Sequence, residues 1–192
     1  MVFDPNGACS KIPAEQRLNV YALVIYIPDP LGRFLDELRT ELVPGCNPHA
    51  HVSVLPPRPL AVDWRVAGEQ VKACAEQWTP FEIVLGRIRI FPVTNVIYLE
   101  LAQGADEMFR IHGAMNTEAL AFNEPFAYHP HITVAQEIPP GEVAGINRRA
   151  EELWDRYTGP RHFRADRTAF VQNTMGNCWI DLVEFSLGPI SA

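Results

Sequence analysis

The sequence contains two tetrapeptides that pair a histidine with a hydroxyl side chain. In HVSV, His51 is followed two residues later by Ser53, and in HITV, His131 is followed by Thr133. On a β-strand, alternate side chains point to the same face, so each histidine would share a face with its hydroxyl. Histidine exchanges a proton near neutral pH, and a hydroxyl can donate a hydrogen bond to a phosphate oxygen. One such tetrapeptide is common by chance, but two at equivalent places indicate a site.

These four groups suit the opening of a cyclic phosphodiester. The reaction needs a base that deprotonates the attacking water and an acid that protonates the departing oxygen. One neutral and one protonated histidine can do this without a metal, while the hydroxyls stabilise the charge that builds on the phosphate. Because the two motifs are nearly equivalent, the sequence does not say whether His51 or His131 is the base.

The elements that position the motifs repeat in the two halves of the chain. Apolar runs predict strands at 21–27, 51–55, 81–91, 95–101, 131–136, 163–172 and 178–187, and helical spacing predicts helices at 31–42, 63–78, 106–120 and 141–157. Each half reads strand, helix, histidine-bearing strand, helix, strand. The matched positions are Trp64 with Glu142, Ile83 with Ala165, Ile97 with Ile180, and His51 with His131.

This repetition predicts an ancient duplication in an α+β protein. We expect residues 1–19 to form an irregular arm and residues 20–192 to form one bilobal domain. Its lobes would come from about 20–91 and 95–187, a layout that leaves room for strand exchange. The two motif histidines would lie on central strands of the two lobes, close enough to contact one phosphate.

The paired motifs and the order of elements resemble the 2H phosphoesterases, named for two H-x-T/S motifs. This family includes RNA 2′,3′-cyclic phosphodiesterases that are often called 2′–5′ RNA ligases. The resemblance covers roughly residues 20–187 and implies two antiparallel sheets around a central groove, with helices outside. It implies that His51 and His131 are catalytic and that Ser53 and Thr133 hold the phosphate, although threonine is commoner than serine in the first motif. It also implies that hydrolysis leaves a 2′-phosphate.

A zinc site is the main alternative for the histidines. His49 with His51, and His129 with His131, give two HxH pairs, which is a known zinc-ligand spacing. Hydrolytic zinc sites usually add a further carboxylate or histidine nearby, and neither motif is closely followed by one. We therefore expect no metal and place His49 and His129 at the rim of the groove. No P-loop or GxGxxG motif indicates a nucleotide cofactor, so we expect none.

Other residues carry weaker signals. Arg58 follows the first motif and could reach a phosphate, although a surface arginine is an equal alternative. Four aromatic residues could stack on a base, with core packing as the alternative: Phe91, Phe126, Tyr128 and Trp179.

Composition restricts the partners. The 23 acidic and 16 basic residues give a net charge of −7, which argues against a broad nucleic-acid surface and favours a small cyclic nucleotide or an RNA terminus. No apolar run approaches the ~20 residues that span a bilayer, and no signal peptide precedes the first strand, so we expect a cytoplasmic monomer. The four cysteines form no CxxC pair, and we expect Cys9, Cys46, Cys74 and Cys178 to be free thiols.

We therefore predict a metal-independent phosphodiesterase that acts on 2′,3′-cyclic phosphate ends of RNA or on small cyclic nucleotides. Two alternatives remain open. The same groups could cleave or reversibly join 2′–5′ phosphodiester bonds, or the scaffold could bind an RNA end or a nucleotide without catalysis.

Overall fold

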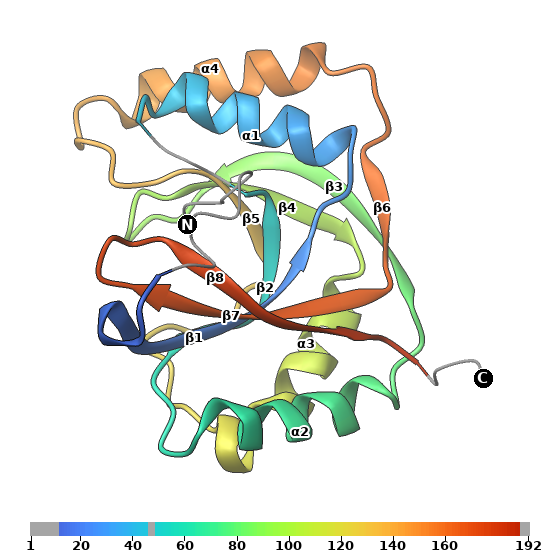
Figure 1. Ribbon diagram of the computed structural model, residues 1–192. Helices are drawn as coiled ribbons and strands as arrows, with labels where there is room; N and C mark the ends of the chain where they lie inside the picture. Colours follow the sequence, from blue (N-terminus) through green and yellow to red (C-terminus); the bar gives the residue numbers. More distant parts are fainter. Residues whose placement is uncertain (1–11, 46–48, 189–192) are drawn as a thin grey trace.

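The two motif strands belong to two separate antiparallel sheets of four strands each. The computed structural model describes residues 12–45 and 49–188, and it shows the α+β architecture that the sequence predicts (Figure 1). The strand order is β2–β1–β7–β8 in the first sheet and β5–β4–β3–β6 in the second. The strands are β1 (Arg17–Tyr26), β2 (His51–Arg58), β3 (Phe81–Ile90), β4 (Ile97–Gln103), β5 (His131–Ala135), β6 (His162–Ala165), β7 (Arg167–Thr174) and β8 (Trp179–Ser186).

The strand orders of the two sheets are equivalent, as a duplication requires. Each sheet begins with a motif strand at its edge, and the next strand is the one that precedes that motif strand in the chain. The third strand of each sheet comes from the other half, because β7 pairs with β1 and β3 pairs with β4. The two halves therefore exchange strands, and both sheets draw on residues 20–91 and 95–187.

Two expectations about the later strands are wrong. The predicted strand 163–172 is two strands, because the chain leaves the second sheet after Ala165 and enters the first at Arg167. The matches of Ile97 with Ile180 and of Ile83 with Ala165 also fail. β4 occupies the place of β1, whereas β8 lies at the edge that β6 forms in the second sheet. β3 likewise occupies the place of β7, whereas Ala165 lies on β6. The pattern of apolar residues from 163 to 172 does not show where the chain passes from one sheet to the other.

Both motif strands lie at sheet edges, where we expected central strands. β2 and β5 contact each other, so the two edges meet. β2 also continues through Pro56 and Pro57 to Arg58, beyond the predicted end at 55. Proline lacks a backbone N–H, and an edge strand tolerates it because one side of that strand needs no partner.

Two pairs of helices cover the sheets from outside (Figure 1). α1 (Leu31–Leu42) and α4 (Val143–Arg156) pack together on the second sheet, while α2 (Trp64–Ala75) and α3 (Ala105–Met115) pack mainly on the first. α1, from the first half of the chain, therefore packs on the sheet that carries the second motif, and α3, from the second half, packs mainly on the sheet that carries the first motif. No described helix is both long enough and apolar enough to span a membrane.

Local chemistry accounts for the start of α2 and for the face that α1 buries, but the predicted helix ends are less accurate. The Asp63 side chain accepts a hydrogen bond from the Arg65 N–H and caps the start of α2, as the sequence indicates. α1 buries Leu31, Leu35 and Leu38 at helical spacing, which directs one face toward the second sheet. The predicted helix at 106–120 is shorter, because α3 ends at 115 and a separate 3-10 turn follows at 118–120.

At the N-terminal end, the first strand begins earlier than we predicted. Ala14–Gln16 form a 3-10 turn and β1 starts at Arg17, so only residues 12 and 13 of the expected arm are described without regular structure. The rest of that arm, residues 1–11, lies outside the described residues.

The prediction of free thiols is wrong for Cys178. Cys178 is disulfide-bonded, whereas Cys74 is a free, half-buried thiol. Cys9 and Cys46 lie outside the described residues. Spacing alone does not reveal a disulfide between distant cysteines, because the fold decides which ones meet.

Candidate active site

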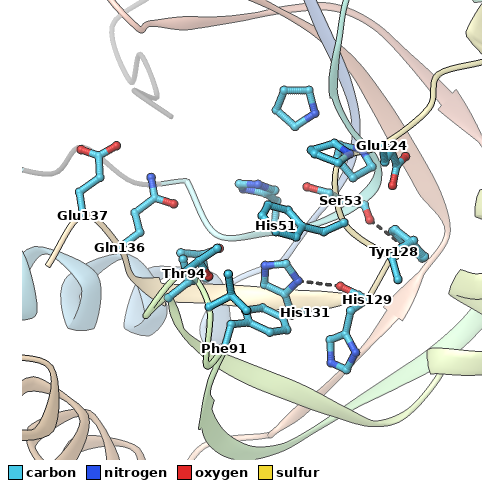
Figure 2. Close-up of a pocket in the computed structure, with 18 of the residues that line it drawn as sticks. His51, Ser53, Phe91, Thr94, Glu124, Tyr128, His129, His131, Gln136 and Glu137 are labelled. Atoms are coloured by element: carbon cyan, nitrogen blue, oxygen red, sulfur yellow. Dashed lines mark hydrogen bonds between the residues drawn. The ribbon is translucent and has the colours of Figure 1, made fainter. Parts of the chain in front are cut away.

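The two sheet edges that meet at β2 and β5 enclose a cleft of about 630 Å³. His51, Ser53, His131 and Thr133 all line this cleft, and each is half-buried. Figure 2 shows His51, Ser53 and His131 close together. The apolar residues between and after them in both motifs are buried, as strand alternation predicts. The structure therefore brings the four motif residues to one place.

Each motif histidine is fixed by the same backbone contact. His51 Nδ1 lies 2.7 Å from the carbonyl oxygen of His49, and His131 Nδ1 lies 2.7 Å from that of His129. A carbonyl oxygen can only accept, so Nδ1 carries the hydrogen in both rings. The remaining nitrogen, Nε2, is then left to take or give a proton in the cleft.

The site lowers the pKa of both motif histidines. Burial lowers the pKa of His51 to about 3, the hydrogen bond to His49 opposes this, and the positive charge of Arg39 adds to it. Burial also lowers the pKa of His131, against the opposing hydrogen bond to the carbonyl of His129. Both rings are therefore neutral at neutral pH in the free protein.

Arg39 is a cleft residue that the sequence analysis missed. It lies on α1, is only 5% exposed and lines the cleft, and its charge acts on His51. It is the only lysine or arginine among the described residues that line the cleft. The sequence did contain an indication of this position, because Arg39 lies four residues after Leu35 on the apolar stripe of a helix. Burial of a charged side chain is costly, so an arginine on such a stripe indicates a specific role.

Arg58 is not brought to the cleft, contrary to the suggestion that it reaches phosphate. Its side chain is 2% exposed, and its guanidinium donates to the carbonyls of Pro56 (3.0 Å) and Leu120 (2.9 Å). It also donates to Asn116 Oδ1 at 2.7 Å and forms a salt bridge with Glu124. These bonds fasten the segment 116–124 to the end of β2.

A second set of contacts joins Tyr128 and α3 to the first motif. The Tyr128 hydroxyl donates to the carbonyl of Ser53 at 2.8 Å (Figure 2), and His112 Nδ1 donates to the carbonyl of Val54 at 2.8 Å. The rings of His112 and Tyr128 stack in parallel with centroids 3.7 Å apart. Sequence reasoning gave His112 no role, because a single histidine on a helix has no pattern.

The two histidines expected at the rim have different locations. His129 lines the cleft and packs edge-on against Phe91 and Tyr98. His49 is not among the residues that line the cleft, and its ring stacks on Tyr26 at 3.8 Å. Among the described residues, no group of three or more histidine, cysteine, aspartate or glutamate side chains could hold a metal ion.

Aromatic side chains form much of the cleft wall. Phe91 stacks on Tyr98 with centroids 4.0 Å apart and packs edge-on against His131 at 4.9 Å. Phe126 is 60% exposed and lines the cleft, and so does the largely buried Trp179. All four aromatic residues singled out in the sequence line the cleft: Phe91, Phe126, Tyr128 and Trp179.

Two exchanged sheets with paired histidine–hydroxyl motifs on facing edges define the two-histidine phosphoesterase class. The family model of the 2′-5′ RNA ligase superfamily matches residues 27–177, which include both motifs. The chain belongs to this superfamily.

Curated relatives carry names that agree with this assignment, and solved structures share the fold. The chain is 25% identical over 135 residues to a Geobacillus kaustophilus protein named "Putative phosphoesterase", covering 66% of this chain and 74% of that protein. An Oceanobacillus iheyensis protein of the same name is 27% identical over 84 residues, and the match spans 43% of this chain and about half of that protein, 49%. Escherichia coli LigT in its apo form has a similar fold, with a TM-score of 0.61, 14% identity and coverage of 90% and 98%. The protein TT0787 of Thermus thermophilus has a TM-score of 0.64, 16% identity and coverage of 90% and 100%.

Proposed function

We propose that this protein hydrolyses 2′,3′-cyclic phosphates to 2′-phosphates without a metal. The observation that carries the proposal is the pair of histidines in one cleft, each with Nδ1 bonded to a carbonyl and Nε2 left for proton transfer. Acid, base and phosphate donors are then all supplied by side chains of this chain.

In the proposed reaction, one histidine removes a proton from water and the water oxygen forms a bond to phosphorus. The bond from phosphorus to the 3′ oxygen breaks, and the second histidine gives its proton to that oxygen. The Ser53 and Thr133 hydroxyls donate to the non-bridging oxygens as their charge rises. Arg39 is in the same cleft and adds a positive charge for the phosphate.

We assign the base role to His51 and the acid role to His131. Arg39 lines the cleft and its charge acts on His51, which favours the neutral form of that ring. Arg39 is not among the groups that shift the pKa of His131, so a bound phosphate anion can favour protonation of that ring.

A known complex supports a nucleotide substrate. The related fold of Escherichia coli LigT has been crystallised with 3′-AMP, at 14% identity and a TM-score of 0.61 to this chain. Cleavage of 2′–5′ phosphodiester bonds uses the same acid and base and is the second candidate reaction.

The test is a substrate panel with purified protein, in the presence and absence of EDTA. It includes 2′,3′-cyclic mononucleotides, oligonucleotides with a cyclic phosphate end and 2′–5′ linked dimers. We expect hydrolysis of the cyclic phosphates to survive EDTA. Binding without turnover of any substrate would favour a non-catalytic protein, and loss of activity restored by zinc would favour a metal enzyme.

The assigned roles have their own test. A p-nitrophenyl phosphodiester has a leaving group that needs no proton, so an acid is dispensable for it but a base is not. The variant His131→Ala should therefore lose much less activity on this substrate than on a cyclic phosphate. The variant His51→Ala should lose activity by a similar factor on both substrates. If His51→Ala, and not His131→Ala, retained more activity on the p-nitrophenyl substrate, His51 would be the acid and His131 the base.

A further inference from the structure

The cleft walls are mainly apolar beyond the motif residues. They include Phe91, Val93, Val96, Phe122, Phe126 and Trp179. Val93 and Phe126 are 78% and 60% exposed, so two large apolar side chains line the cleft in contact with solvent. Such walls favour a flat, weakly polar group beside the phosphate.

Two acidic residues, Glu124 and Glu137, are among the described residues that line the cleft. Glu124 is held by Arg58, but Glu137 is exposed and makes no ion pair with a described residue. Glu137 lies two residues after the end of β5 and, with Gln136, on the opposite side of the two histidines from Glu124 (Figure 2).

The backbone holds Glu137 in a conformation that most residues avoid. Its φ is +59°, in the left-handed region that glycine and asparagine adopt more readily than glutamate does. Glu137 therefore places at one end of the cleft a carboxylate that has no ion-pair partner within residues 12–45 and 49–188, although its backbone there suits other residues better.

The size of the cleft limits what can occupy it. A volume of about 630 Å³ is in the range of pockets that enclose one small organic ligand. An oligonucleotide would carry further phosphates out of the cleft. Phosphates that leave past Glu137 would be repelled by it, because charges within about 8–10 Å of each other are only partly screened at physiological ionic strength.

We infer that the substrate is a small cyclic phosphodiester with a single phosphate, such as a cyclic mononucleotide, and that Glu137 disfavours the end of a longer RNA. The inference rests on the proposed function and selects among its substrates. The phosphate lies at the motif residues and the base lies against the apolar walls. Glu137 acts as a specificity-determining residue and takes no part in the chemistry.

The test compares adenosine 2′,3′-cyclic phosphate with a trinucleotide that ends in the same group. At low salt, we expect kcat/KM of the wild-type protein to be at least tenfold higher for the mononucleotide. Added salt should narrow this ratio, because it screens the repulsion.

The decisive variant is Glu137→Gln, which keeps the size of the side chain. Coulomb's law for one charge pair at about 10 Å, with an effective dielectric constant of 20–80, gives a change of about 2- to 15-fold. We expect kcat/KM for the trinucleotide to rise by this factor and that for the mononucleotide to change less than twofold. The matched control is Glu69→Gln on α2, which removes an equal charge at an exposed position that does not line the cleft.

The outcomes separate the two proposals. A trinucleotide hydrolysed as well as the mononucleotide, or the same effect from both glutamate variants, would overturn the inference and leave the proposed function intact. If neither compound is hydrolysed, the proposed function is overturned. In that case, the dissociation constants of adenosine 2′-phosphate and the trinucleotide 2′-phosphate still decide the preference, because binding of products needs no turnover.

Discussion

The half-buried ring of His51, whose pKa is strongly lowered, should make the protein sensitive to acid. Its pKa is held at about 3 in the folded state, against about 6.5 in an unfolded chain. As the pH falls below about 6.5, the unfolded state binds the proton first, so the free energy of unfolding decreases until the pH reaches about 3. The variant His51→Asn removes the titrating ring and retains an amide N–H near the position of Nδ1.

The magnitude follows from the pKa difference. Each unit corresponds to about 1.4 kcal/mol, so the ring contributes a loss of up to about 2.7 kcal/mol between pH 7 and pH 4.5. Because His51 is only half-buried, solvent screening reduces this to about 1–2 kcal/mol.

The assay is urea unfolding at pH 7.0 and pH 4.5 for the wild-type protein, His51→Asn and Ser53→Ala. Other titrating groups contribute equally to all three proteins, so the difference between the two pH values isolates the ring. His51→Asn should lose about 1–2 kcal/mol less than wild type on acidification, and Ser53→Ala should lose as much as wild type. Equal losses in the wild type and His51→Asn would refute the reasoning, because burial would then not penalise the charged ring.

The remaining predictions concern activity and two buried charges. Alanine at His51 or His131 should each lower kcat by ~10²–10⁴, and the double variant should be little worse, because half of an acid–base pair has no partner; full activity in either single variant would end the two-histidine mechanism. The pH profile of kcat/KM should be bell-shaped with its maximum on the acid side of neutrality, since burial lowers both histidine pKa values; a maximum above pH 8 would contradict this. Burial raises the pKa of Asp36 to about 6, so ionisation of its carboxyl group destabilises the fold as the pH rises from about 4 to 6. The variant Asp36→Asn should therefore have a free energy of unfolding about 1–3 kcal/mol higher than wild type at pH 7 and the same as wild type at pH 4. The variant Arg58→Met should lower the free energy of unfolding by about 3–5 kcal/mol, because it leaves the buried charge of Glu124 uncompensated. A decrease of less than about 1 kcal/mol would show that the salt bridge does not stabilise the fold.

The motif residues could be predicted from the sequence because their chemistry and alternation are local. His51 and Ser53 share a face for the same reason in any strand, and the repeat at His131 indicated that the two strands are equivalent. The α+β class also follows from local periodicity. Whether the motif strands lie at an edge or in the centre depends on pairing with distant strands, and no pattern within a strand records that.

The rest of the site depends on contacts between segments distant in sequence. Arg58 resembled a phosphate ligand because it follows a motif, but Asn116 and Glu124 occupy its guanidinium from a loop roughly 60 residues away. Tyr128 supports Ser53 through a backbone carbonyl, which accepts the same bond whatever its side chain. Arg39 was detectable as a charge on an apolar stripe, although its place in the cleft was not.

The exchange of strands has a consequence for how the chain is made. β1 lies inside the first sheet, between β2 and β7, so one of its sides has no partner until residues 167–174 have been synthesised. When β1, β2 and every helix have emerged from the ribosome but β7 has not, one edge of β1 still has unpaired backbone groups, which can pair with a strand of another chain. The pairing of β1 with β7 joins opposite ends of the sequence, and such long-range contacts form slowly. The cleft can therefore be completed only after nearly the whole chain has left the ribosome, and a fragment that ends before β7 is expected to aggregate.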